Sequence, residues 1–210
     1  MVAEDVVETE VLIVGAGPVG LMLANLLGTY GRRAIVLEAL DELIDYPRAV
    51  GLDDEAFRLI QTVGLAEQIE PLTGPAHIMR LVNARGEVIL YNDPQVHDFG
   101  WPRKNGFNQP LVDRELAAGL DRFDGVELRF GHTVETVEED ADGVTAVADV
   151  RRPDGSTEQR ARVARLGELG RGGRGGLGAS KDGFELFGRR RRRDGLGAQP
   201  IVGVAVAGDL

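Results

Sequence analysis

Apolar runs of two different lengths follow one another along the first part of the chain. Residues 11–14 form a short, unbroken run rich in β-branched side chains, which is typical of a parallel strand buried on both faces. A longer, mostly apolar stretch after the first run predicts a helix with Pro18 in its first turn, and a second short run at 33–37 predicts another strand. This order indicates a strand–helix–strand unit, in which the two strands lie parallel in one sheet.

Glycines stand at the turn between the first strand and the helix. Gly15, Gly17 and Gly20 have the spacing G-x-G-x-x-G, which permits a tight turn, close backbone approach to a pyrophosphate, and close packing of helix on strand. Pro18 suits the first helical turn, where its missing N–H is not needed. Glu38 ends the second strand, 18 residues beyond Gly20, where a carboxylate can accept both hydroxyls of an adenosine ribose. The pattern predicts a dinucleotide-binding turn; the alternative is a glycine-rich turn without a ligand.

The segment after Glu38 predicts helices and a hairpin. Asp53 or Asp54 caps a helix that Gly64 ends, and its expected buried face carries Ala56, Leu59, Ile60 and Val63. The acidic run at 53–55 is explained by this capping rather than by carboxylate catalysis. The other expected elements are a hairpin of strands 77–83 and 87–92, a loop at 93–108 that could line a pocket, and a helix from Pro110 to about Phe123.

Alternating positions after residue 125 predict a run of strands. One strand is expected at 126–130, and three more follow at 133–137, 144–150 and 156–163. Asp-Gly pairs at 142–143 and 154–155 mark the turns between the last three. These three strands predict an antiparallel meander beside the parallel sheet.

Composition limits the function classes. The net charge of −10 argues against general affinity of the whole chain for nucleic acid or anionic membranes. The absence of cysteine excludes disulfides and thiolate catalysis, and the three histidines show no metal-ligand spacing. Residues 11–28 have the length of a membrane span, but Gly15, Gly17 and Gly20 inside it, with Pro18 and Asn25, argue against one. The acidic start lacks the features of a signal peptide, so we expect a cytoplasmic protein.

Charge and glycine content change abruptly near residue 163. Residues 1–160 hold 14 Lys/Arg and 29 Asp/Glu, net −15, whereas residues 161–210 hold 10 and 5, net +5. We therefore divide the chain into a domain at 1–163, with inserted strands at 77–108, and an atypical Gly/Arg-rich segment at 164–210 that includes five arginines at 189–193. Three interpretations of this segment remain open. They are an RNA-binding or nuclear-signal tail, a disordered basic tail, and a stretch that is not a native continuation of the fold. We favour the third, which a shifted reading frame, a truncated gene or an uncertain sequence would explain and which resequencing of the gene would test.

Four segments carry a resemblance to a known family. They are VLIVGAGPVGLMLANLLGTYG, LIDYPRAVGLDDEAFR, FGWPRKNGFNQPLVDREL and VELRFGHTVETVEEDADGVTA, which together span about residues 9–160. In these segments the chain resembles the class A FAD-dependent aromatic hydroxylases, flavoprotein monooxygenases, of the 3-(3-hydroxyphenyl)propionate hydroxylase type. The resemblance implies a Rossmann-like α/β domain that binds FAD, part of a substrate domain, NADH or NADPH as co-substrate, and a small phenolic acid and O2 as reactants.

The same resemblance implies roles for individual residues in binding FAD. It places Gly15, Gly17, Pro18 and Gly20 around the pyrophosphate, Glu38 at the adenosine ribose, Arg48 near the pyrophosphate and flavin, Gln109 near the ribityl chain, and Val134 at the adenine. From the residues alone, Arg48 could equally be a solvated loop arginine, and Gln109 could simply bond backbone at the start of its helix. Phe99 and Trp101 could wall a substrate pocket or cover a core. No catalytic side chain is identified.

The chain departs from the family pattern after the meander. The expected D-G-x-x-S-x-V-R and G-D-x-x-H segments are absent, as is most of the substrate domain. We therefore expect a truncated chain whose flavin site is half built, with weak or absent FAD retention and no hydroxylation by this chain alone. Two alternatives stay open: an NAD-dependent dehydrogenase on the same strand–helix–strand unit, and a non-catalytic fragment that binds nothing well or binds nucleic acid through its basic end.

Overall fold

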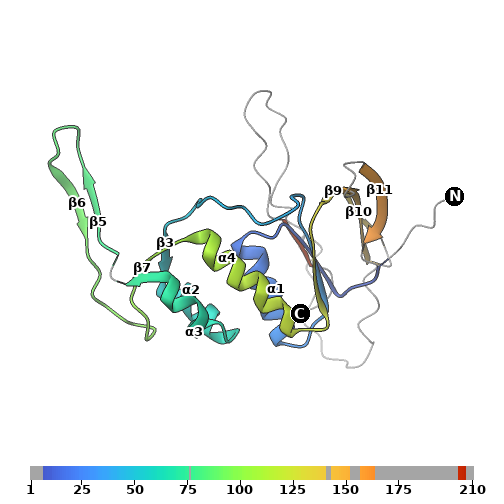
Figure 1. Ribbon diagram of the computed structural model, residues 1–210, viewed down its shortest axis with the longest axis horizontal. Coiled ribbons are helices and arrows are strands. Elements are labelled where there is room, and N and C mark those ends of the chain that lie inside the picture. The colour runs from blue at the N-terminus through green and yellow to red at the C-terminus, as the bar shows by residue number, and fades with distance from the viewer. Residues whose placement is uncertain (1–6, 76, 141–142, 152–156, 164–202, 207–210) are drawn as a thin grey trace. The chain divides into compact units, whose positions relative to one another are not determined.

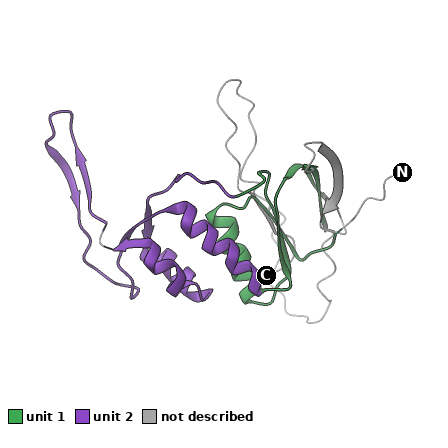
Figure 2. Ribbon diagram, in the orientation of Figure 1, with its two compact units in different colours: residues 1–42, 123–210 green, residues 43–122 purple. Residues whose placement is uncertain are grey.

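The computed structural model describes residues 7–75, 77–140, 143–151, 157–163 and 203–206 (Figure 1). By its internal contacts the chain divides into two units, which Figure 2 colours separately. Unit 1 consists of residues 1–42 and 123–210, and unit 2 consists of residues 43–122. Most of the Gly/Arg-rich segment lies outside the described residues, so the boundary near residue 163 stays a prediction. The Asp-Gly turn at 154–155 also lies outside them, as does Asp142 of the other turn.

Unit 1 is built on the predicted strand–helix–strand unit. Strands β1 (Val11–Val14) and β2 (Ala34–Leu37) pair in parallel, and helix α1 (Pro18–Thr29) connects them. Strand β8 (Val126–Arg129) adds to β2 in parallel, and β12 (Gly203–Val206) pairs with the other side of β1 in the antiparallel sense. The sheet order β12-β1-β2-β8 confirms the α/β class expected from the sequence.

The two faces of this sheet bury different side chains. The parallel register pairs Leu12 with Ile35 and Ile13 with Val36, so each pair lies on one face. Ile13 faces α1, because its Cγ2 lies 3.3 Å from where a Cβ on Gly20 would stand. Complete burial of a side chain such as Ile13 or Leu21 contributes about 1.5–3 kcal/mol each. A helix on one face and a second layer on the other therefore explain the unbroken apolar strands.

That second layer is the predicted antiparallel meander. It comprises β9 (His132–Asp140), β10 (Gly143–Arg151) and β11 (Thr157–Val163), in the order β11-β10-β9. The buried cluster that joins it to the sheet consists of Leu12, Ile35, Leu37, Ala146 and Ala148. The small alanines of β10 let the meander come close to the larger side chains of β1 and β2. The sequence prediction of a meander beside the parallel sheet is confirmed.

Unit 2 contains short strands that the sequence did not predict. Strands β3 (Gly51–Asp53), β7 (Lys104–Phe107) and β4 (Thr73–Pro75) pair antiparallel in the order β3-β7-β4. The prediction of a loop throughout 93–108 is wrong for residues 104–107, which form β7. The sequence Lys-Asn-Gly-Phe of β7 has no strand pattern. Its buried Asn105 donates from Nδ2 to the backbone oxygens of Leu52 and Pro102, at 3.4 and 2.7 Å, and these bonds help to hold the strand in place.

Helix α2 (Asp54–Thr62) begins and ends as predicted. Asp53 caps it by accepting a hydrogen bond from the N–H of Ala56 at 2.9 Å, and Gly64 follows its end with φ +72°. The expected buried face was wrong at one position, because Leu59 is exposed and Phe57 is buried instead. Phe57 stacks on Trp101, with ring centroids 4.7 Å apart, so a partner distant in sequence decides which face is covered.

The remaining helices of unit 2 are short. Helix α3 (Ala66–Ile69) continues into the 3-10 turn η1 (Glu70–Leu72). Helix α4 (Gln109–Ala118) continues into the 3-10 turn η2 (Gly119–Arg122), so the helix expected from Pro110 begins one residue earlier and its last part tightens. None of the helices in the described ranges has the length and apolar character that a bilayer crossing requires.

The predicted hairpin forms, and its apolar side chains are exposed on both faces. Strands β5 (Met79–Val82) and β6 (Val88–Asn92) pair antiparallel with Leu81 opposite Leu90, and Gly86 takes φ +80° in the connection. All nine strand residues but Asn92 are exposed. A two-stranded hairpin with apolar side chains on both faces is marginal in water, and its edges can pair with another chain.

We expect this hairpin to drive self-association of the isolated chain at micromolar concentration. The double substitutions L81K/L90K and L81D/L90D should both shift the population toward monomer in sedimentation velocity, because either charge disfavours burial of this face. The stability of the fold should change by less than about 0.5 kcal/mol, as is usual at exposed positions. The opposite charges of the two variants separate loss of apolar surface from a change in net charge. A monomeric parent chain, or variants as associated as the parent, would contradict the expectation.

Candidate dinucleotide-binding site

The glycine turn between β1 and α1 has the geometry that its spacing predicts. Gly15 has φ +101°, a conformation that side chains disfavour, and its N–H donates to the Leu37 oxygen at 2.7 Å. Gly17 is the extended N-cap of α1, and Pro18 occupies the first helical position. A Cβ on Gly20 would lie 2.1 Å from the Gly15 oxygen, so the helix can approach the turn this closely only with glycine there. The N–H groups of the first helical turn, which have no acceptor within a helix, remain available to an anion.

Glu38 places a buried carboxylate against this turn. Glu38 is only 6% exposed. Oε2 accepts a hydrogen bond from the Ala16 N–H at 2.7 Å, and Oε1 accepts one from the Leu40 N–H at 3.0 Å. Each carboxylate oxygen can accept a further bond. The end of β2 is thereby held at the glycine turn, with acceptor capacity left for hydroxyl groups.

The end of β8 and the start of β9 fix the backbone of Glu38. The Glu38 N–H donates to the Arg129 oxygen and the His132 N–H donates to the Glu38 oxygen, both at 2.8 Å.

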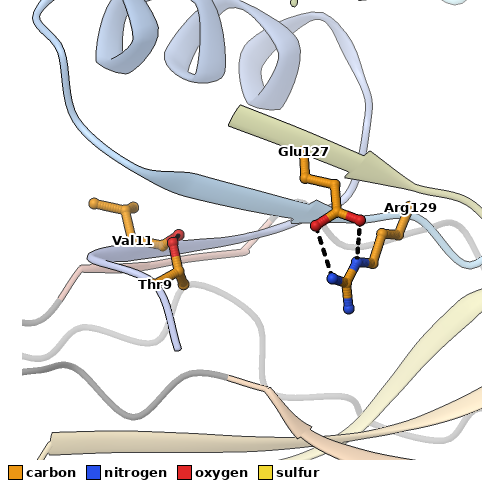
Figure 3. Close-up of polar contacts among 4 residues, drawn as sticks. All are labelled: Thr9, Val11, Glu127 and Arg129. Atoms are coloured by element: carbon orange, nitrogen blue, oxygen red, sulfur yellow. Dashed lines mark hydrogen bonds and ion pairs between the residues drawn. The ribbon is translucent and has the colours of Figure 1, made fainter. Parts of the chain in front are cut away.

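Figure 3 shows the Arg129 side chain in a two-pronged pair with Glu127, at 2.8 and 2.7 Å. Hydrogen bonding to Arg129 lowers the pKa of the Glu127 carboxyl. Figure 3 also shows Thr9, whose buried hydroxyl donates to the Val11 oxygen at the start of β1.

In unit 2 the side chain of Gln109 is hydrogen-bonded to the backbone of Arg48. Gln109 is 2% exposed, and its Oε1 accepts hydrogen bonds from the N–H groups of Arg48 and Ala49, both at 2.9 Å. The Arg48 side chain itself is exposed. Gln109 is the first residue of α4, whose N-cap is Asn108. The side chain of Gln109 thus bonds backbone, as one interpretation expected, but the backbone of a segment about sixty residues away rather than that of its own helix.

Sequence reasoning missed Asp113, which lies beside Gln109. Asp113 is 4% exposed, and its Oδ2 accepts a hydrogen bond from Gln109 Nε2 at 3.0 Å. Within the described part of the chain Oδ1 has no hydrogen-bond partner. Burial raises the pKa of the Asp113 carboxyl, while the bond from Gln109 and the positive charge of Arg48 oppose that rise. The available signal was the spacing, since residues four apart on a helix face each other.

The other candidate residues take structural positions. Val134 lies on β9, pairs with Ala148 and packs against the cluster between meander and sheet. Trp101 donates from its indole nitrogen to Gln61 Oε1 at 3.1 Å, and Arg58 lies over the ring of Phe99 at 5.2 Å, so both aromatics cover α2. In the described ranges no group of three or more acidic, histidine or cysteine side chains could hold a metal ion.

The glycine turn, the carboxylate at the end of β2 and the parallel β1-α1-β2 unit define unit 1 as a dinucleotide-binding domain. Sequence comparison narrows the class. The sequence matches the family described as FAD binding domain over residues 8–163, and the chain belongs to that family.

Individual relatives agree with this assignment. The chain is 51% identical over 153 residues to the 3-(3-hydroxy-phenyl)propionate/3-hydroxycinnamic acid hydroxylase of Mycolicibacterium smegmatis, a match that covers 73% of this chain and 27% of the relative. The structure resembles p-nitrophenol 4-monooxygenase from Pseudomonas putida, with TM-score 0.62, 30% identity, and coverage of 75% of this chain and 40% of that one. It also resembles aklavinone-11 hydroxylase in complex with FAD and aklavinone, with TM-score 0.58, 25% identity, and coverage of 75% and 32%.

These matches confirm the resemblance to flavoprotein aromatic hydroxylases on which the sequence prediction of FAD depended. The chain spans about a quarter of the length of the curated relatives it matches, 27% and 24% in two cases. The roles of single residues in binding FAD are predictions from the resemblance.

Proposed function

We propose that this chain is the FAD-binding part of a monooxygenase that uses NADH or NADPH and O2 to hydroxylate a phenolic acid, such as 3-(3-hydroxyphenyl)propionate. The observation that carries the proposal is the buried Glu38 carboxylate, which accepts a hydrogen bond from the N–H of Ala16 in the glycine turn. The chain is also 51% identical, over 153 residues, to a hydroxylase named for that substrate. The resemblance of the structure to FAD-dependent hydroxylases supports it.

The residues of unit 1 fit the adenosine and pyrophosphate end of FAD. Gly15 and Gly17 leave space beside backbone, and the first turn of α1 offers N–H groups and the positive end of its dipole to phosphate oxygens. Glu38 has acceptor capacity for the two ribose hydroxyls, and its charge would disfavour a 2′-phosphate. Val134 would offer backbone to the adenine.

For two residues of unit 2 the family resemblance implies roles toward FAD, Arg48 near the pyrophosphate and flavin and Gln109 near the ribityl chain. The exposed guanidinium of Arg48 is available to an anionic phosphate, and Gln109 holds the backbone that carries it. When bound, FAD supplies the redox chemistry with oxygen, while the protein binds, orients and shields the reactants. The reaction itself belongs to the whole hydroxylase, and we expect no hydroxylation by the 210-residue chain.

Titration with FAD and with NAD⁺ tests the proposal. We expect quenching of flavin fluorescence with a dissociation constant in the micromolar range or weaker, and binding of NAD⁺ at least about tenfold weaker than FAD, a difference of about 1.4 kcal/mol. Circular dichroism on the same sample controls for folding. Equal affinity for NAD⁺ would favour the dehydrogenase alternative. A folded chain that binds neither nucleotide would refute the proposal for this chain, and sustained turnover of a phenylpropionoid would refute its incompleteness.

A further inference from the structure

A chain of hydrogen bonds in unit 2 connects a buried carboxylate to a distant backbone segment. Asp113 Oδ2 accepts from Gln109 Nε2 at 3.0 Å, and Gln109 Oε1 accepts from the N–H groups of Arg48 and Ala49 at 2.9 Å each. Asp113 and Gln109 lie one helical turn apart on α4, and both side chains are buried. From these contacts we propose that Asp113 is a positioning residue, which sets the direction of the Gln109 amide and thereby fixes the backbone at Arg48.

The direction of the amide matters because its two ends are chemically opposite. The oxygen of a glutamine side chain accepts two hydrogen bonds, and its nitrogen donates two. The N–H groups of Arg48 and Ala49 fill both acceptor positions of Oε1. If the amide turned over, its NH2 group would face these two donors and its oxygen would face the Asp113 carboxylate. All three bonds would be lost, so an acceptor at position 113 selects the observed direction.

The same bonds limit what Gln109 can do for a ligand. With both acceptor positions of Oε1 in use, the Gln109 side chain retains a single N–H for any further partner. We therefore assign Gln109 to the Arg48 segment rather than to a cofactor hydroxyl that needs an acceptor. The connection of the Arg48 segment to FAD binding rests on the proposed function, in which Arg48 is the cationic residue that would meet the cofactor.

Amide hydrogen exchange at Arg48 and Ala49 tests the positioning role without any cofactor. Asp113→Leu removes the acceptor at similar size, and we expect exchange of these two amides to accelerate at least about tenfold as the segment loosens. Asp113→Asn can still present an oxygen to Gln109 Nε2, and we expect exchange within about threefold of the parent chain. Glu115→Leu removes a carboxylate two residues further along the same helix and should leave both amides unchanged. Protection in α2 reports whether each variant is folded.

Exchange in the two Asp113 variants can contradict the positioning role of Asp113. Unchanged exchange at Arg48 and Ala49 in a folded Asp113→Leu variant would refute it, as would equal acceleration in Asp113→Asn. If Asp113→Leu does not fold, the parent chain decides by NMR. The Gln109 side-chain NH2 must then exchange more slowly than that of the exposed Gln68 and must shift when the Asp113 carboxyl titrates. A Gln109 NH2 group that behaves like that of Gln68 would refute the role.

FAD titration of the same variants separates this inference from the proposed function. If the positioning role and the proposed function both hold, Asp113→Leu weakens FAD binding by about the same factor as Arg48→Ala. Asp113→Asn then keeps the affinity of the parent chain. If exchange at Arg48 accelerates while FAD affinity stays constant, the positioning role stands and the assignment of Arg48 to the cofactor fails. If exchange does not change but Arg48→Ala weakens FAD binding, the cofactor assignment stands and the positioning role fails.

Discussion

Replacement of Gly20 by alanine should abolish FAD binding and destabilise unit 1 more than any other single methyl group added to its helix. The new Cβ would lie 2.1 Å from the Gly15 oxygen and 3.3 Å from its carbonyl carbon, both backbone atoms that cannot rotate away. Either α1 must move off the sheet or the turn must change its course. We expect a loss of about 3 kcal/mol, the upper end for overpacking, which outweighs the gain of about 1 kcal/mol that alanine brings to a helix.

Urea unfolding followed by circular dichroism measures this loss, and FAD titration measures its effect on the turn. Gly51→Ala is the matched control, because its Cβ would meet nothing within 4 Å and Gly51 is not in the left-handed region. Gly28→Ala is a second comparison, since its Cβ would fall 2.4 Å from the ring of Phe123, far from the turn along α1. It should lower stability while retaining FAD affinity once folded. A Gly20→Ala variant with the unfolding midpoint and FAD affinity of the parent would show that the turn does not depend on this contact.

The features that the sequence predicted are those that neighbouring residues determine. The glycine turn, the α2 cap at Asp53 and the hairpin connection at Gly86 depend on conformations that a few local residues permit or exclude. The meander was predictable because its alternation and turns lie within one continuous stretch. The same local reasoning gave the strand–helix–strand unit and hence the dinucleotide class.

The features that the sequence missed depend on residues far apart in the chain. Strand β7 forms at a stretch with weak strand preference because Asn105 bonds the backbone oxygen of Leu52, more than fifty residues away, as well as that of the nearby Pro102. Phe57 is buried in place of Leu59 because Trp101, more than forty residues away, stacks on it. The hydrogen-bond chain from Asp113 to Arg48 likewise crosses about sixty residues, and periodicity carries no information about such a pair.

Glu38→Ala should produce the largest loss among substitutions of polar side chains in unit 1. The carboxylate accepts hydrogen bonds from Ala16 at 2.7 Å and Leu40 at 3.0 Å, and alanine would leave both N–H groups without this acceptor. An unsatisfied buried donor costs about 1–3 kcal/mol, so we expect unfolding to become easier by about 3 kcal/mol in total. FAD affinity should fall at least about tenfold in the protein that remains folded, because the ribose loses its acceptor.

Two further variants separate the structural role of Glu38 from its role toward a nucleotide. Glu10→Ala is the matched control, because Glu10 also accepts a backbone N–H, that of Arg33 at 2.7 Å, but in an exposed setting, and it should cost about 1 kcal/mol or less. Glu38→Gln keeps one acceptor oxygen for one of the two N–H groups and should fall between the parent and Glu38→Ala. The parent should also bind ADP more tightly than 2′-deoxy-ADP, and Glu38→Ala should not distinguish them. If Glu38→Ala lowers stability but keeps that distinction, the carboxylate fastens the end of β2 to the glycine turn and another group reads the ribose.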